Sequence, residues 1–153
     1  QGEASMSEQH VPSIDHAVQQ MNLWLKQLVV EHHLPERQHA LSALRAVLHA
    51  LRDRLTPDQA VHLGAELPTM VRGIYYEGWH LAASPGRERH LQPFLDRVQR
   101  ELPPKFPRDA KGTTEAVFAL LAGTLDRGQI IKVVAELPEP LRALWPEDVR
   151  HGH

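Results

Sequence analysis

Two short stretches carry the side chains best suited to binding another molecule. Arg52 and Asp53 stand together at a predicted helix end, and the segment that starts at Arg72 adds three aromatic side chains. Arginine and aromatic residues are enriched at binding surfaces, so these stretches could form an anion site or a protein contact. The candidate binding surface consists of Arg52, Asp53, Arg72, Tyr75, Tyr76 and Trp79.

The same residues also allow a structural interpretation. Asp53 can pair with Arg72 on a later helix and lock the two helices together, and ion-pair networks of this kind are commonly structural. Tyr75 and Trp79 stand at i and i+4 on one helical face, which would place them in the core and leave Tyr76 exposed. The sequence favours the structural interpretation for the charged residues, whereas the aromatic residues stay open between core and surface.

The sequence contains 11 histidines, which raises the question of a metal site. Three or four ligands must converge to hold zinc. His62 and Glu66 share one helical face, and His32, His33 and His39 lie close in sequence, but no two histidines stand at i and i+4 as in zinc-binding helices. We therefore predict surface histidines, no metal site and no cofactor.

Nucleophilic and phosphate-binding motifs are absent from the sequence. It has no cysteine, none of its serines stands in a Gly-x-Ser-x-Gly setting, and no glycine-rich loop leads into Gly-Lys-Ser/Thr. Carboxylates such as Glu115 and Asp126 are not distinguished from ordinary surface charge. We therefore predict no catalytic residues and a protein without catalysis of its own.

Composition excludes several classes of partner. The formal net charge is −2, so no overall positive field attracts nucleic acid. No apolar run reaches the roughly 20 residues that cross a bilayer, and the lack of cysteine fits a reducing compartment. We expect a cytoplasmic protein whose partner is another protein or a second copy of itself, with nucleic acid and membrane disfavoured.

A repeat with a period of 70 organises the elements that carry these residues. The tetrapeptide Ala-Glu-Leu-Pro occupies positions 65–68 and returns at 135–138, and Leu51 aligns with Leu121 in the same register. Self-similarity at a fixed period indicates repeated supersecondary units, and two units are too few for a solenoid. We predict an all-α fold in which two pseudo-repeated helical halves pack into one bundle-like domain.

Apolar residues at helical spacing and local start signals predict about eight helices. Thr56 and Asp126 are typical N-caps followed by glutamine at the third helical position, and Ser13 is the predicted N-cap of the first helix. The short apolar segment 130–137 could also offer a patch for oligomerisation. The predicted helices are 14–33, 36–55, a third one ending at 67, then 69–76, 87–102, 113–125, 130–137 and 138–145.

The repeat also suggests how the chain is divided. Residues 1–10 are interpreted as a tag remnant and disordered start, 11–80 as the first helical repeat and 81–86 as a linker. Residues 87–146 form the second helical repeat, and residues 147–153 form a tail.

Residues 51–79 resemble a bacterial family known as domain of unknown function 2267. The resemblance rests on Arg-Asp-Arg-Leu at 52–55, Leu-Pro at 67–68, Arg-Gly at 72–73 and the pair Gly78 and Trp79, and it continues into 135–146. It implies a bacterial, soluble, helical protein and no particular activity. The second half lacks counterparts of the Arg-Asp-Arg and Gly-Trp elements, so any site should be asymmetric.

These observations lead to two predictions of function. The first is an interaction or regulatory module that binds a protein partner or itself. The alternative is a small-ligand, anion or metal-binding protein with a pocket between the two repeats, near Arg52, Asp53 and Arg72.

Overall fold

A computed structural model describes residues 10–81 and 89–151, and all regular structure in these residues is helical. Residues 1–9 of the predicted start and residues 82–86 of the predicted linker lie outside the described residues. The prediction of an all-α fold is confirmed. The helices are α2 (Pro12–His32), α3 (Arg37–Arg52), α4 (Pro57–Glu66), α5 (Thr69–Tyr75), α6 (Leu91–Glu101), α7 (Ala110–Thr124), α8 (Arg127–Ala135), α9 (Glu139–Arg142) and the 3₁₀ helix η2 (Glu147–Val149).

The helix starts of the two halves keep the spacing seen in the sequence. Helix α8 starts at Arg127, 70 residues after α4 at Pro57, and α9 starts at Glu139, 70 residues after α5 at Thr69. Helix α9 is shorter than α5, and α2 is much longer than α6. The order of helices is therefore the same in both halves, while their origin as copies of one unit stays a prediction.

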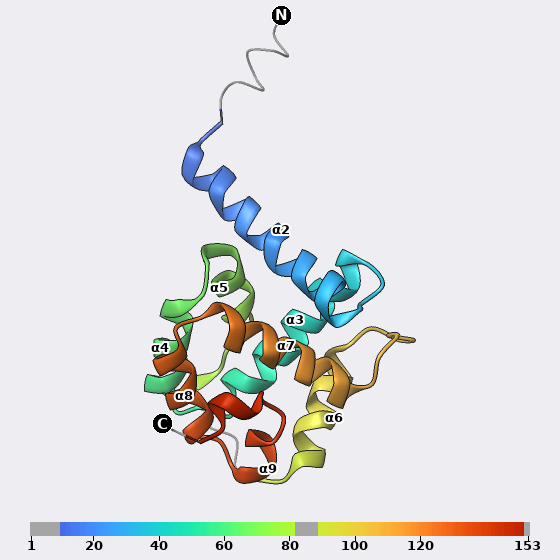
Figure 1. Cartoon of the computed structure of the whole chain (residues 1–153), viewed down its shortest axis with the longest axis vertical. Coiled ribbons are helices and arrows are strands. Elements are labelled where there is room, and N and C mark those ends of the chain that lie inside the picture. Colours follow the sequence, from blue (N-terminus) through green and yellow to red (C-terminus); the bar gives the residue numbers. More distant parts are fainter. Residues whose placement is uncertain (1–9, 82–88, 152–153) are drawn as a thin grey trace, which may run out of the picture.

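Helices α3 and α7 form the centre of the molecule (Figure 1). Helix α3 contacts α2, α5, α6 and α7, and α7 also contacts α2, α6 and α8. From Ala43 to Arg52, every residue of α3 except Arg45 is buried. Leu51 of α3 and Leu121 of α7 are both 0% exposed. The apolar stripes that the sequence assigns to these two helices thus make the core.

Two N-caps fix where α4 and α8 begin. Thr56 accepts a hydrogen bond from the backbone N–H of Gln59, and the Gln59 side chain accepts one from the N–H of Thr56. This reciprocal pair is the capping box that the sequence predicts. Asp126 accepts from the N–H of Gln129 at 3.1 Å at the start of α8.

Helix α2 packs against the body with its second half only, and its first half projects from the molecule (Figure 1). Met21, Leu25 and Leu28 are buried, whereas no described residue before Met21 is. The predicted N-cap Ser13 is wrong, because Val11 occupies the cap position and the proline that follows it fits the first turn.

Helix α8 offers no exposed apolar patch, contrary to the expectation from its sequence. Ile130, Val133 and Val134 are buried in the core, and so is Leu137 just after the helix. Ile131 is half-buried against the same core. The apolar residues of this helix therefore serve folding.

The segment after α9, predicted as a tail, packs on the body. Val149 in η2 is 1% exposed, and Arg127 donates to the Asp148 carboxylate at 2.8 Å and to its carbonyl at 2.7 Å. Trp145, just before η2, stacks on Phe118 with ring centroids 4.0 Å apart. The described C-terminal residues thus close one end of the core.

Candidate functional site

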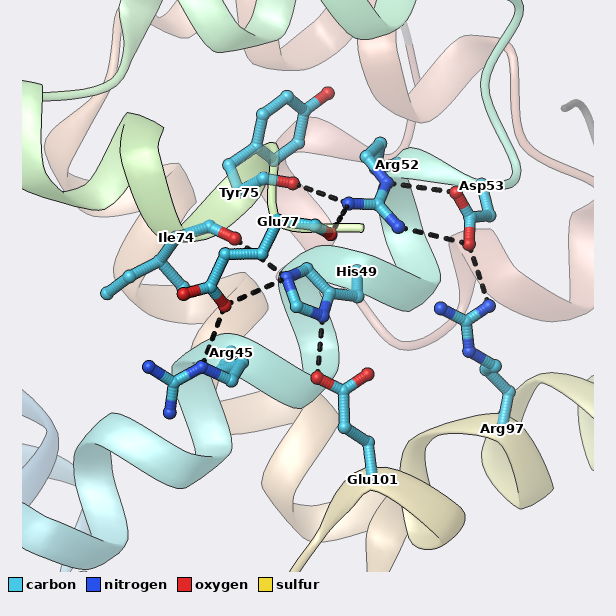
Figure 2. Close-up of polar contacts among 9 residues, drawn as sticks. All are labelled: Arg45, His49, Arg52, Asp53, Ile74, Tyr75, Glu77, Arg97 and Glu101. Atoms are coloured by element: carbon cyan, nitrogen blue, oxygen red, sulfur yellow. Dashed lines mark hydrogen bonds and ion pairs between the residues drawn. The ribbon is translucent and has the colours of Figure 1, made fainter. Parts of the chain in front are cut away.

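The polar face of α3 consists of three residues at helical spacing. Arg45, His49 and Arg52 stand at i, i+4 and i+7, so they share one face of the helix. This face meets α6 and the end of α5 (Figure 2). With their charged partners they form what we call the α3 polar network: Arg45, His49, Arg52, Asp53, Glu77, Arg97 and Glu101.

Arg52 is the buried centre of this network. Its side chain is 2% exposed. One terminal amino group donates to the carbonyls of Tyr75 and Glu77 at 2.8 and 2.7 Å, and Nε donates to Asp53 at 2.9 Å (Figure 2). The last carbonyls of a helix have no partner within the helix. Arg52 therefore satisfies the end of α5 and joins it to α3.

Asp53 extends the network to α6. Its carboxylate accepts from Arg97 at 2.7 Å as well as from Arg52. Burial raises the pKa of Asp53, but the hydrogen bonds and charges of these two arginines together outweigh burial and lower it below its ordinary value. The predicted pair of Asp53 with Arg72 is wrong, because α6 brings Arg97 to this carboxylate and Arg72 binds elsewhere.

His49 is held by acceptors on both sides of its ring. Nδ1 lies 2.6 Å from the Glu101 carboxylate, and Nε2 lies 2.7 Å from the Ile74 carbonyl. A carbonyl can only accept, so Nε2 is the donor in the hydrogen bond to Ile74. Glu77 lies 3.6 Å from Nε2 and accepts from Arg45 at 2.9 Å. Both ring nitrogens are thus engaged, and neither is free to act as a general base.

Arg72 caps the end of α4. Its Nε donates to the Gly64 carbonyl at 2.8 Å, and one amino group donates to the carbonyls of Leu67 and Ala65 at 2.9 and 3.3 Å. Gly64 and Ala65 lie in the last turn of α4, where carbonyls lack the regular helical partner, and the Gly64 carbonyl also accepts from the Leu67 N–H at 3.1 Å. The role of Arg72 in this structure is therefore to stabilise the turn between α4 and α5.

Arg142 stands 70 positions after Arg72, but it makes no such bonds. Its Nε is buried and has no hydrogen-bond partner within residues 10–81 and 89–151. Each arginine lies on the short helix that follows a Leu-Pro step, at Pro68 and at Pro138. The two arginines share a sequence context, but Arg72 is hydrogen-bonded to the protein and the buried Nε of Arg142 is not.

This difference predicts unequal effects of matched substitutions. Arg72→Met should lower the free energy of unfolding by about 1–2 kcal/mol, because it leaves charged hydrogen bonds to helix-end carbonyls unmade at a partly screened, exposed position. Arg142→Met breaks no hydrogen bond of the described residues, and we expect a change of less than about 0.5 kcal/mol. Urea denaturation of both variants measures the difference, and equal losses would contradict it.

Tyr75 belongs to the core. Its side chain is 0% exposed, and its hydroxyl donates to the Ala60 carbonyl at 2.6 Å. Burial raises the pKa of this phenol far above its ordinary value. Tyr75 therefore ties α5 to α4 as a neutral, hydrogen-bonded core residue.

Tyr76 and Trp79 are half-buried beside Tyr75. The Tyr76 ring lies edge-on to Tyr75 at 5.0 Å and against Trp79 at 5.5 Å between centroids. It also covers Gly64, where a Cβ would come within 2.8 Å of the ring carbon Cζ. Tyr76, expected to be the exposed aromatic residue, is therefore packed onto α4, and only part of its surface faces solvent.

The six residues of the candidate binding surface are thus only partly brought together. The structure joins Arg52, Asp53 and Tyr75 in or next to the α3 polar network, with Tyr76 and Trp79 alongside. It places Arg72 at the end of α4. Most of their polar atoms are already bonded to the protein, so we find in them a cross-link between helices.

Five members of this network were not predicted as site residues: Arg45, His49, Glu77, Arg97 and Glu101. His49 could have been found, because it shares one face of α3 with Arg45 and Arg52. Arg97 and Glu101 gave no such signal, because charged residues on the outer face of an amphipathic helix are ordinary.

A cavity of about 240 Å³ lies between α4 and α8. Its walls include pairs of residues whose positions differ by 70, and Arg52 and Asp53 do not line it. Leu63 and Val133 provide an apolar floor, and the polar groups stand around it. The paired positions are Gln59 with Gln129, His62 with Lys132 and Leu63 with Val133.

Residues 10–81 and 89–151 contain neither a metal-ligand cluster nor a membrane-spanning helix. Within residues 10–81 and 89–151, no three His, Asp or Glu side chains come together as a metal ion would require. In the same part of the chain, no helix is both long enough and apolar enough to cross a membrane.

Comparison with known proteins places the chain in a family. The family model described as "Uncharacterized conserved protein (DUF2267)" matches residues 21–144. The match includes the whole α3 polar network and begins at the first buried residue of α2, after its projecting half. No curated protein matches the chain. The chain belongs to the DUF2267 family of uncharacterized conserved proteins.

Proposed function

We propose that the protein is an interaction module without catalysis of its own, and that its partner is a second copy of the chain bound through the projecting half of α2. The supporting observation is a row of exposed apolar side chains, here called the α2 stripe. Val11, Ile14 and Val18 are 50%, 59% and 43% exposed. Apolar side chains that are exposed together mark contact sites, whereas isolated ones are normal.

The α2 stripe continues the buried seam of the same helix. Ile14, Val18, Met21, Leu25 and Leu28 alternate spacings of four and three, the pattern of helices that pair along a seam. From Met21 onward this seam is buried, and α2 contacts α3, α5 and α7. Before Met21 nothing in the described residues covers it. The apolar face of α2 is thus buried along its second half and exposed to solvent along its first half.

A second copy suits this stripe in charge and in shape. Within residues 11–25, Asp15 alone carries a formal charge when histidine is neutral, so two copies approach with little repulsion. In an antiparallel pair, Ile14 of one copy meets Val18 of the other, and the reverse contact follows from the two-fold symmetry. The contact involves far fewer than the roughly 20–30 residues per side of a standard interface, so we expect a weak dimer.

Sedimentation equilibrium tests this proposal with a matched pair of variants. Over about 1 µM to 1 mM, a range that spans weak protein affinities, the native chain should shift from monomer toward dimer. Ile14→Glu with Val18→Glu should remain monomeric. Leu23→Glu with Val30→Glu should dimerise like the native chain, because these residues are 58% and 60% exposed on the other side of the same helix. A native chain that stays monomeric, or two variants that behave alike, would refute the proposal.

The cavity between α4 and α8 supports a second candidate, a small-ligand-binding protein. Its apolar floor with polar groups around it is the usual composition of a ligand site, although its volume of about 240 Å³ is small for one. A ligand there would not contact the α2 stripe. Ile14→Glu with Val18→Glu therefore separates the two candidates, because this variant should lose dimerisation and keep ligand binding.

A further inference from the structure

A second concave site lies at the C-terminal end of the described chain. Its volume is about 360 Å³, and it is lined by Glu139, Arg142, Ala143, Arg150 and His151. Helix α9, which carries two of these residues, lies at the end of the molecule opposite the projecting half of α2 (Figure 1). The site is therefore separate from the proposed dimer contact and from the cavity between α4 and α8.

The first observation that points to a ligand is the state of Arg142. In the first half of the chain, the guanidinium of Arg72 donates hydrogen bonds to three backbone carbonyls. Arg142 lines the concave site instead, and its guanidinium has no hydrogen bond or ion pair within the described residues. Arg142 is half-buried and its buried Nε has no acceptor, so an anion in the site would supply one.

The second observation is that Arg150, the other arginine of the lining, is held in place. Arg150 donates from Nε to the Trp145 carbonyl at 2.7 Å, which anchors its guanidinium at the site. The segment that carries Arg150 is fixed in turn by the bonds of Arg127 to Asp148 at 2.8 and 2.7 Å. The 1% exposure of Val149 shows that the segment is also packed into the core. Two guanidinium groups thus line one cavity from two anchored elements.

The charges of the lining residues select an anion. Arg142 and Arg150 contribute two positive charges, and Glu139 contributes one negative charge, so the site is positive even with His151 neutral. This contrasts with the formal charge of −2 for the whole chain. Guanidinium groups present planar pairs of donors that match phosphate oxygens, and two of them suit a doubly charged oxyanion.

We propose that the site lined by Arg142, Arg150 and His151 binds a phosphate group. The group could belong to a free phosphate compound or to a phosphorylated side chain, and the chemistry of recognition is the same for both. Titration calorimetry of the full chain with inorganic phosphate and with N-acetyl-phosphoserine amide distinguishes the two sources. Saturable binding of either compound supports the proposal. If neither compound binds saturably, the proposal is overturned.

Three variants show whether the binding belongs to this site. Arg142→Gln should weaken phosphate binding at least about tenfold, the loss that follows when one charge-assisted pair is removed. Arg142→Lys keeps the charge without the planar fork, so it should bind with intermediate affinity and provides a second test if the glutamine variant folds poorly. Arg37→Gln removes the same charge from an exposed position outside the site and should bind like the native chain. Equal weakening by Arg37→Gln and Arg142→Gln would mean that only net charge matters, and the proposal would fail.

Discussion

Replacing Arg52 by methionine should destabilise the fold by about 3–5 kcal/mol, the range found when one partner is removed from a buried charged network. The substitution keeps an apolar stem of similar length but leaves the carbonyls of Tyr75 and Glu77 without donors. It also removes one of the two arginines that pair with the Asp53 carboxylate. Because the Arg52 side chain is only 2% exposed, water cannot replace its hydrogen bonds at low cost. Urea denaturation followed by circular dichroism measures the loss.

Arg97→Met is the matched control for this result. Arg97 also binds Asp53, but its side chain is 34% exposed, so its removal should cost no more than about 1 kcal/mol. Losses of the same size in both variants would show that burial of Arg52 is not what makes it important. A loss below about 1 kcal/mol for Arg52→Met would mean that the α3 polar network does not hold the helices together.

The stability of Arg52→Met should depend on pH in a direction that follows from the pKa of Asp53. The pKa of Asp53 is lowered in the folded protein, so its contribution to stability is present above the unfolded pKa of about 3.9 and is lost as the pH falls through the folded value. Arg52→Met removes part of the cause of this shift and leaves Arg97. The stability difference between the native chain and the variant should therefore narrow when the pH falls below about 4.

Leu51→Ala and Leu121→Ala should each destabilise the protein by about 2–5 kcal/mol, because each leaves a cavity at a fully buried position. The two leucines lie on α3 and α7, which contact each other, and both are 0% exposed. Chemical denaturation of the two variants gives the losses directly. The control is Leu23→Ala on α2, where the side chain is 58% exposed and the change should stay within about 0.5 kcal/mol. Losses well under 1 kcal/mol at both core positions would show that the core is packed differently.

The helices were predictable where the chain carries its own start and stop signals. The predicted segment 69–76 matches α5 at Thr69–Tyr75, because Pro68 fixes its beginning. The predicted segment 130–137 begins late, since α8 starts at Arg127 directly after its Asp126 cap. Residues 87–88 of the predicted segment 87–102 lie outside the described residues, and 89–90 are not helical, since α6 starts at Leu91 after His90, which caps it without a side-chain hydrogen bond.

The partners within the site were not predictable in this way. Arg97 and Glu101 bind residues 44 and 52 positions before them, and nothing local in the sequence indicates which charged residue α6 will bring to α3. The sequence suggested Arg72 as the partner of Asp53 because it lies on a nearby helix. The three carbonyls at the end of α4 are a closer set of acceptors for Arg72. Every residue has a backbone carbonyl, so the sequence does not mark the carbonyls at a helix end as acceptors. Pairing residues by opposite charge therefore does not predict this role of Arg72.

The hydrogen bonds from α6 to α3 link the unfolding of the two halves. In a linear array each repeat contacts only its neighbours, and single units can unfold in turn. Here Glu101 and Arg97 of the second half hold His49 and Asp53 of the first, and α7 lies in the centre beside α3. Neither half can open without breaking the bonds that join it to the other. We therefore expect the two halves to unfold as one cooperative unit, while the projecting end of α2, which shares none of these bonds, can fray on its own.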